Sequence, residues 1–400
     1  MRIDIKTARI LTSEEARETL LLFRHQGDDP HRILESFLGM FPKKVAEALA
    51  ELRQLRRRAT QKFELGQDMF FTKEQLEQSS SEKVAAWRAR RFADAGFQEV
   101  WDPCCGIGAD SIALARAGLR VHASDKDESA VHFAQANAEV HGIDTIDFEV
   151  ADAAETIPPE GAVFLDPARR RGSRRIMSPD DWSPDPAAIA RLLEGRPGAG
   201  LKLSPAVDLQ VLLEKFPAPD EIEVISLHGE NKETVFWYGA CASGAARRAS
   251  SLPAGETLAG EEEREIEISE VQEYLFDPDP SLTHSGLLGR FAREHGLRAL
   301  DPQIGYLTSR EPLTSPFVDC FEVLAVEALD PRKMKAVLRR LQVGRLLIRK
   351  RGITERPRTL EQRFLPRNAG DQELTLLATR IGDRHIGIVG RPVVPDEEDS

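Results

Sequence analysis

The spacing of hydrophobic and polar residues differs between the first 78 residues of this chain and the segment that follows. Up to about residue 78 the apolar residues recur at helical spacing, and we expect helices at 13–23, 31–40 and 42–58. From residue 80, after a leading helix at 80–92, short apolar runs alternate with longer amphipathic runs. The expected strands are 98–102, 121–125, 147–151, 162–166, 200–204, 221–227 and 233–239, and the expected helices are 109–117, 128–141, 185–194 and 208–215. This alternation predicts an α/β fold with a mainly parallel sheet and a terminal hairpin.

The pattern changes again after residue 240. Residues 242–265 are rich in Ala, Gly, Ser and Arg, then acidic, and lack periodicity, which favours a linker. Beyond it we expect strands at 321–326 and 345–351, helices at 332–341 and 358–364, and a closing hairpin from 373–379 and 385–390. The predicted organisation is a helical N-terminal domain (1–78), an α/β domain (79–245), a linker (246–265), a small α+β domain (266–394) and a frayed tail (395–400).

Composition narrows the class of protein. With 30% charged and 41% hydrophobic residues, the 400-residue chain resembles soluble globular proteins. It has no run of about 18 apolar residues and no secretory signal, so we expect a cytoplasmic protein without membrane contact, favoured as a monomer. The four cysteines form neither a disulfide framework nor a zinc spacing, and we expect no metal.

Charge is distributed unevenly along the chain. The total is −12, yet residues 332–367 carry thirteen Lys and Arg against two Glu. One concentrated basic segment in an acidic chain favours contact with nucleic acid, whereas the alternative is a solvated helix face with extended arginines.

A glycine loop at 102–111 is the most informative motif. An apolar strand ends at Asp102, Gly106 and Gly108 form a tight turn, and a helical run follows. This geometry holds nucleotides, but the third glycine of a dinucleotide loop is replaced by Ser111. A carboxylate at Asp102 suits a cation such as S-adenosylmethionine better than a pyrophosphate, which leaves NAD(P) as the alternative.

Acids at three further strand ends favour the same cofactor. Asp125 is placed to accept hydrogen bonds from ribose hydroxyls, Asp152 to face the adenine amine, and Asp166 to lie beside the reacting methyl group. The expected cofactor residues are Asp102, Cys104, Gly106, Gly108, Asp110, Asp125, Lys126, Asp152, Ala153 and Asp166.

The loop resembles the first motif of the trimethylguanosine synthase family, an RNA cap guanine-N2 methyltransferase family that reads Asp-x-x-Cys-Gly-x-Gly-Gly-Asn-Thr-Ile. The likeness extends over residues 80–240, and residues beyond 265 resemble the THUMP-like domain found behind bacterial methyltransferases. The resemblance implies a class I methyltransferase with a Rossmann-like seven-stranded sheet, S-adenosylmethionine as cofactor, and an RNA-binding C-terminal domain.

The segment after Asp166 carries the expected acceptor site. Trimethylguanosine synthases have Ser-Pro-Pro-Trp where this chain has Asp166-Pro167-Ala168-Arg169, so Arg169 replaces the tryptophan that stacks on the cap base. Arginine can still stack on a base and bind phosphate. Methylation at carbon 5 of a pyrimidine would need a cysteine nucleophile, and the strand ending at Ser204 supplies none, which favours a nitrogen acceptor.

We therefore predict a methyltransferase acting on a base nitrogen, guanine N2 or another amine, in structured RNA such as tRNA or rRNA. The alternatives are a small-molecule or protein acceptor, or a module that binds cofactor and RNA without catalysis. The expected catalytic residues are Asp166, Pro167 and Arg169, and the expected RNA contacts are Arg169, Arg170, Arg171, Arg174, Arg175, Arg345, Arg349, Lys350 and Arg351.

Overall fold

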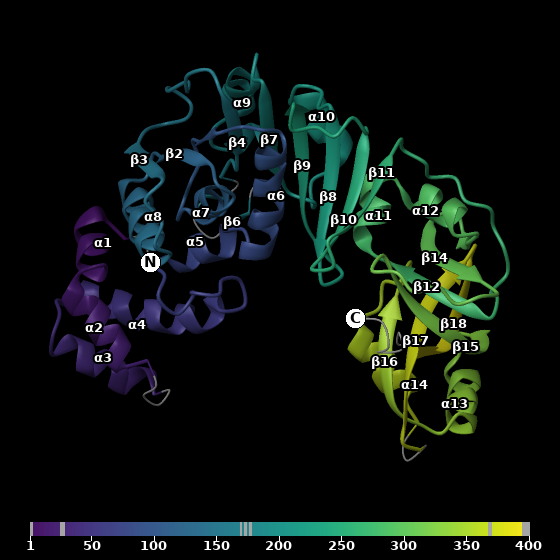
Figure 1. Ribbon diagram of the computed structural model, residues 1–400. Coiled ribbons are helices and arrows are strands. Elements are labelled where there is room, and N and C mark those ends of the chain that lie inside the picture. Colours follow the sequence, from purple (N-terminus) through teal and green to yellow (C-terminus); the bar gives the residue numbers. More distant parts are fainter. Residues whose placement is uncertain are drawn as a thin grey trace. The chain divides into compact units, whose positions relative to one another are not determined.

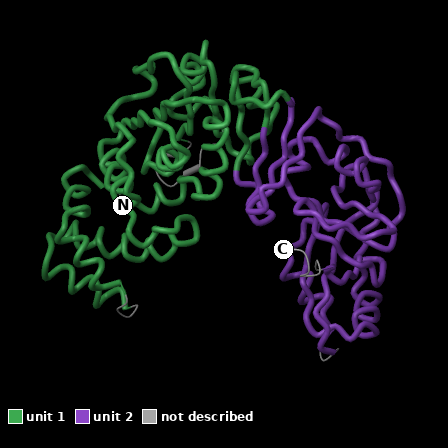
Figure 2. The backbone as a smooth tube through the Cα atoms, viewed as in Figure 1, with its two compact units in different colours: residues 1–222, 233–244 green, residues 223–232, 245–400 purple. Residues whose placement is uncertain are grey.

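The computed structural model describes residues 3–24, 29–168, 170–171, 174–175, 178–366 and 370–393. The chain divides into two compact units, drawn in two colours in Figure 2. Unit 1 comprises residues 1–222 and 233–244, and unit 2 comprises residues 223–232 and 245–400. The expected tail at 395–400 lies outside the described residues.

Unit 1 begins with short helices, as the helical spacing predicted. They are α1 (Ile5–Leu11), α2 (Glu14–Leu22), α3 (Pro30–Leu38), α4 (Lys43–Ala59) and α5 (Lys73–Gln78), followed by α6 (Glu82–Asp94). Side chains cap their first turns: Ser13 accepts a hydrogen bond from the Ala16 amide, and Thr72 and Gln75 form a reciprocal capping box. Helices α1–α4 gather beside α8 (Figure 1).

The alternating part of unit 1 folds into a twisted sheet. Its elements are β1 (Glu99–Asp102), α7 (Ala109–Arg116), β2 (Arg120–Asp125), α8 (Glu128–Val140), β3 (Ile146–Val150), β4 (Ala162–Leu165), α9 (Pro186–Leu193), β7 (Gly198–Leu203), α10 (Leu209–Lys215), β8 (Glu221–Leu227) and β9 (Glu230–Gly239). Within unit 1 the strands are ordered β9-β7-β4-β1-β2-β3, whereas β8 lies mostly in unit 2 (residues 223–227). Strand β9 runs antiparallel to β7, and the pairs β7–β4, β4–β1, β1–β2 and β2–β3 are parallel. The predicted α/β methyltransferase-type sheet is confirmed.

Helices cover both faces of this sheet. On one face Phe92 of α6 packs edge-on against Phe164 and Trp237. On the other face Leu201 and Leu203 of β7 share a buried cluster with apolar residues of α9 and α10. Alternate positions along β7 therefore point to opposite layers, which sets the direction of Lys202 between the two leucines.

The N-terminal helices share one core with the sheet-covering helices of unit 1. Their buried residues form a single cluster with Ile107, Ala109, Phe133 and Ala136. Asn137 of α8 is fully buried at this contact. Its side-chain oxygen accepts a hydrogen bond from the Phe70 amide, and its side-chain nitrogen donates to the carbonyls of Phe70 and Ile107, both at 3.0 Å. Helices α1–α5 are thus built into the unit.

Residues 246–265 were expected as a linker, and this secondary-structure expectation was wrong. The segment forms an antiparallel hairpin of β10 (Arg247–Leu252) and β11 (Glu256–Gly260). Its buried side chains are Ala249, Ser250, Ser251 and Leu252, so polar serines interrupt the apolar positions, and Ser250 donates to the buried Glu223 at 2.5 Å. The strand therefore carries no apolar alternation that a sequence pattern could reveal.

The rest of unit 2 is a mostly antiparallel sheet with helices. Its elements are β12 (Tyr274–Pro278), α11 (Pro280–Ser285), α12 (Leu288–Glu294), β13 (Arg298–Asp301), β14 (Ile304–Ser309), β15 (Val318–Ala328), α13 (Pro331–Arg340), β16 (Val343–Lys350), α14 (Pro357–Phe364), β17 (Gln372–Ile381) and β18 (Arg384–Pro392). The strand order is β13-β14-β12-β15-β18-β17-β16. Among the described strands of this sheet, the β16–β17 pair is parallel, with α14 forming the crossover, and the other pairs are antiparallel.

Candidate functional site

The glycine loop connects β1 to α7 and lies against the end of β2. Gly106 (φ +53°) and Gly108 (φ +82°) adopt left-handed backbone conformations that favour glycine. The Gly106 amide donates to Oδ2 of Asp125 at 3.1 Å. A Cβ on Gly108 would lie 3.1 Å from that of Ala134, whereas one on Gly106 would meet nothing within 4 Å. Gly108 therefore permits close helix packing, and Gly106 leaves the loop backbone open to a ligand.

Asp102 is a buried carboxylate without a cationic partner among the described residues. It is 1% exposed and accepts hydrogen bonds from Ser111 Oγ at 2.6 Å and the Cys104 amide at 3.4 Å. Burial raises the pKa of the Asp102 carboxyl to about 8. A ligand with an ammonium or sulfonium group would supply the missing charge, so this donor set fits S-adenosylmethionine.

The other predicted cofactor residues occupy the same edge of the sheet. Asp125 ends β2, and burial raises the pKa of its carboxyl. Asp152 follows β3 and accepts a hydrogen bond from the Ala154 amide at 2.9 Å, and Ala153 is buried. The side chain of Lys126 donates to Ser183 Oγ at 2.5 Å.

Asp110 is engaged within the protein. One oxygen forms an ion pair with Arg88, and the other accepts a hydrogen bond from Ser80 at 3.0 Å. Arg88 also pairs with Glu233, and all three charged groups are buried. Burial opposes ionisation of Asp110, yet the charges of Arg88 and Lys202 lower its pKa. The helix that follows the glycine loop is thus fixed by a buried network of Asp110, Arg88 and Glu233.

The acceptor motif begins at the end of β4, next to β7. Leu165 pairs in register with Leu201, which places Asp166 beside Lys202. Nζ of Lys202 lies 2.5 Å from Oδ2 of Asp166 and 2.9 Å from Oγ of Ser80. Pro167 is buried. From the sequence, Lys202 was expected to point toward this edge or to extend outward from its strand, and Ser80 was given no role at the site; Lys202 is buried here.

The arginines after Asp166 can be placed only in part. Arg169 lies outside the described residues. The backbone forms a two-strand ladder of β5 (Arg170–Arg171) and β6 (Arg174–Arg175). Their expected contacts with RNA stay predictions.

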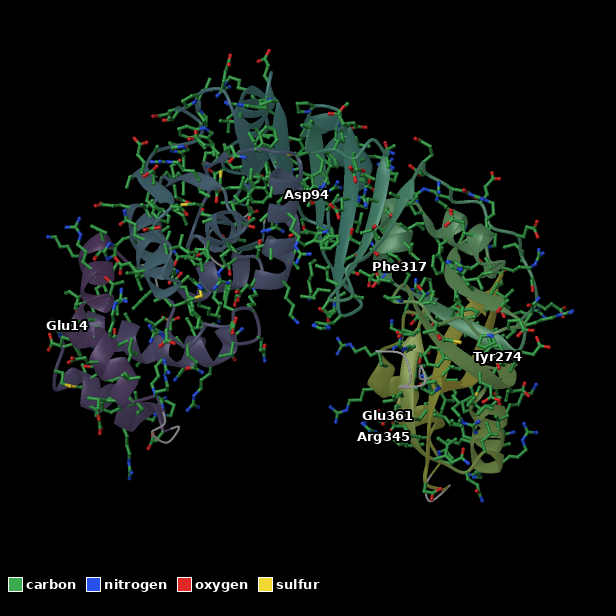
Figure 3. The ribbon with its side chains drawn as sticks, viewed as in Figure 1. Glu14, Asp94, Tyr274, Phe317, Arg345 and Glu361 are labelled. Carbon is green, nitrogen blue, oxygen red and sulfur yellow. The ribbon has the colours of Figure 1, made fainter. Side chains whose placement is uncertain are left out.

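In unit 2 the predicted RNA-binding cations of β16 are engaged with the protein. Arg345 pairs with Glu373 at 2.7 Å, and Arg349 pairs with Asp277 and Asp319 (Figure 3 labels Arg345). Arg351 pairs with Asp277 at 2.8 Å, and Lys350 donates to the Ile353 carbonyl at 2.7 Å. Arg349 and Arg351 line a pocket of about 600 Å³.

Uncompensated cations lie on the helices of the same domain. Met334 and Leu338 bury the inner face of α13, which leaves Arg332, Arg339 and Arg340 exposed. These three, with Lys335 of the same helix and Arg356 and Arg358 at the start of α14, have no carboxylate partner in the described part of the chain. Helices α13 and α14 contact each other and β16. We refer to these six residues as the helical cation cluster.

The described residues contain neither a membrane-spanning helix nor a cluster of metal-binding side chains. Among the described residues no helix combines the length and apolar character needed to cross a membrane. Over the same residues no group of three His, Cys, Asp or Glu side chains is arranged to hold a metal ion.

Comparison with known proteins gives three kinds of match. A family profile described as a methyltransferase domain matches residues 100–165, and one described as THUMP domain-like matches residues 318–392. An uncharacterized S-adenosylmethionine-dependent methyltransferase of Mycobacterium tuberculosis is 34% identical over 344 residues, covering 84% of this chain and 92% of the relative. An uncharacterized RNA methyltransferase of Geobacter sulfurreducens is 31% identical over 159 residues, 32% of each protein.

A solved structure shares the whole fold. The crystal structure described as a methyltransferase from Porphyromonas gingivalis W83 covers 98% of this chain and all of its own length, with a TM-score of 0.77 and 24% identity. The trimethylguanosine synthase likeness of residues 80–240 has no counterpart among these matches, which support the coarser grouping only.

Proposed function

This chain belongs to the family of S-adenosylmethionine-dependent methyltransferases, and we propose that its methyl acceptor is a base nitrogen, guanine N2 or another amine, in structured RNA such as tRNA or rRNA. The observation that carries the RNA assignment is the helical cation cluster in a chain of net charge −12. Phosphate binding by exposed, unpaired lysines and arginines is the usual electrostatic basis of RNA affinity.

The cofactor would be held by the glycine loop and the acids around it. Asp102 supplies a buried carboxyl whose ionised form a cationic ligand would stabilise, Asp125 offers its carboxylate at the end of β2, and Gly106 lets the backbone approach closely. S-adenosylmethionine, when bound, supplies a methyl group that leaves without its bonding electrons, which stay on the neutral sulfur.

Asp166 is the proposed contact of the acceptor. Its Oδ2 is held by Lys202, so Oδ1 is left to accept a hydrogen bond from an N–H of the acceptor. That bond directs the nitrogen lone pair away from the carboxylate, and the carboxylate can take the proton that the nitrogen loses. Pro167 and Arg169 follow directly and are proposed to shape the acceptor side.

Two further findings support RNA as the acceptor. The name of the partial relative from Geobacter sulfurreducens assigns that protein to the RNA methyltransferases. The second profile match, THUMP domain-like, covers β15 to β18 and therefore includes the helical cation cluster.

Transfer of a radiolabelled methyl group tests the proposal. Purified protein with labelled S-adenosylmethionine is incubated with total RNA, protein and small-molecule fractions from a strain that lacks the gene. We expect label in RNA, and nucleoside mass spectrometry should place it on a base nitrogen. Label found only in the protein or small-molecule fraction would contradict RNA as the methyl acceptor. Cofactor binding without label in any fraction would indicate a non-catalytic module.

A further inference from the structure

Lys202 is a buried lysine at the reacting edge of the sheet. It is 4% exposed and lies on β7, where the preceding residue pairs in register with the last residue of β4. Among the described residues, its ammonium group has two hydrogen-bond partners, Asp166 and Ser80. Burial of an ammonium group is unfavourable unless a well-placed anion compensates its charge. A lysine at this position would therefore destabilise the fold if its ammonium group had no specific partner.

The second partner anchors Lys202 to a rigid network. Ser80 accepts hydrogen bonds from Lys202 and from Arg88 Nη2 at 2.7 Å, and it donates to Asp110. Arg88 in turn pairs with Asp110 and Glu233. Both carboxylates already have a cation in Arg88, which leaves Asp166 as the ion-pair partner of Lys202.

The same contacts divide the two oxygens of Asp166. Oδ2 faces Lys202, and Oδ1 has no hydrogen-bond partner among the described residues. The Asp166 side chain is 21% exposed, so the carboxylate is held from the buried side and reaches the surface from the other.

We propose that Lys202 is the positioning residue of the methyl transfer: it fixes the orientation of Asp166, so that Oδ1 accepts the N–H of the acceptor. The proposal rests on the proposed function for the identity of the acceptor. It also restricts the acceptor chemistry to groups that donate a hydrogen bond, such as an amine, because an anionic carboxylate cannot donate one.

The first experiment is a double-mutant cycle on the full-length protein. Lys202→Met should lower kcat about 100-fold through loss of orientation, while the Kd for S-adenosylhomocysteine measured by calorimetry stays within about threefold. Asp166→Asn should lower kcat at least as much, and Lys202→Met should add nothing in the Asp166→Asn background. Lys202→Arg should recover part of the loss because it restores the cation.

Two results of this cycle would overturn the proposal. Additive losses would mean that Lys202 acts independently of Asp166, and a large loss of S-adenosylhomocysteine affinity in Lys202→Met would mean that Lys202 serves the cofactor instead. Lys215→Met is the matched control, because this lysine on α10 is exposed and, among the described residues, pairs with the surface residue Asp180 alone, at 2.7 Å. It should leave kcat unchanged.

A spectroscopic measurement separates this proposal from the proposed function. Isotope-edited infrared spectra of protein with labelled aspartate, compared with Asp166→Asn, report the carboxylate band of Asp166 without any acceptor. We expect the band at pH 7 in the wild type and in Lys202→Arg, and its shift or loss in Lys202→Met or, should that variant not fold, in Lys202→Gln. An unchanged band overturns the role of Lys202, whereas absence of RNA labelling with the expected band overturns only the choice of acceptor.

Discussion

At the residue scale, the most telling feature is a buried carboxyl whose ionised form has no cationic partner among the described residues. Asp102 lies beside the glycine loop and, in the described part of the chain, receives two hydrogen bonds. Proteins seldom keep such a group unless a ligand or a reaction uses its charge. The buried carboxylate is thus the part of the site that depends most directly on a cationic cofactor.

Replacing Asp102 should change how stability depends on pH. The pKa of its carboxyl is about 8 in the folded protein and near 3.8 in an unfolded chain. Between these values the folded state binds a proton that the unfolded state has released, so the free energy of unfolding falls as pH rises. Asp102→Asn removes this fall, and we expect its gain over wild type to grow by on the order of 2 kcal/mol from pH 5 to pH 7.

Chemical denaturation without cofactor, at pH 5, 6, 7 and 8, measures this effect. Asp144→Asn is the control, because Asp144 is exposed and its substitution should leave the wild-type pH dependence intact. Parallel curves for wild type and Asp102→Asn would contradict the expectation. The same substitution should also weaken binding of S-adenosylmethionine, since the negative partner is lost.

Some site residues could be predicted from the sequence, and others depend on contacts between distant segments. Strand-end acids such as Asp102 and Asp125 could be found because the end of a strand is visible in the pattern. Lys202 could not be assigned, because its partner Asp166 is distant in sequence and comes close only through the pairing of β4 with β7. Arg349 was predicted to contact RNA from its charge alone, whereas two aspartates from other strands compensate it.

At the element scale, one buried polar side chain of α8 adds hydrogen bonds to the apolar contact between the N-terminal segment and the sheet-covering layer. Asn137 satisfies three backbone groups, from Phe70 and Ile107, inside a fully buried contact. An amide that both donates and accepts cannot be replaced there by an apolar residue without leaving those groups unpaired.

Asn137→Ala should therefore destabilise unit 1 substantially. We expect a loss of about 2–4 kcal/mol in the free energy of unfolding, measured by urea denaturation, because three buried polar groups lose their partner. Gln135→Ala on the exposed side of the same helix should cost less than about 0.5 kcal/mol. Equal losses in the free energy of unfolding of the two variants would mean that the hydrogen bonds of Asn137 contribute little to stability.

The elements also differ in how well the sequence predicted them. Strands β1 to β4 are short apolar runs and were found, whereas β10 was assigned to a linker. The difference lies in Ser250 and Ser251, which are buried because carboxylate and carbonyl partners satisfy them. Such a strand looks like a loop until its long-range hydrogen bonds are known.

At the scale of the whole molecule, charge compensation separates two kinds of cation. Arg345 and Arg349 of β16, and Arg351 directly after it, are paired with acids on β17, β12 and β15. The helical cation cluster is unpaired within the described residues. A phosphate backbone gains most from cations that are not already neutralised. Affinity for RNA should therefore depend on α13 and α14 rather than on β16.

The triple variant Arg332→Gln, Arg339→Gln, Arg340→Gln tests this distribution. We expect weaker RNA binding and a fall of up to about three in the slope of log K against log salt, roughly one for each phosphate contact removed. Fluorescence anisotropy with total tRNA at several salt concentrations measures both quantities. Arg345→Gln, which removes a paired arginine, should change the slope little, and the reverse ranking would place the RNA on β16.

The two cysteines of the glycine loop have a consequence for the enzyme's own integrity. Burial, together with the carboxylates of Asp125 and Asp102, raises the pKa of the Cys104 and Cys105 thiols well above the usual range. A thiol attacks alkylating agents only as its thiolate. A loop proposed to hold a sulfonium alkylating agent therefore presents two sulfur atoms in their unreactive form, which protects the enzyme against methylating itself.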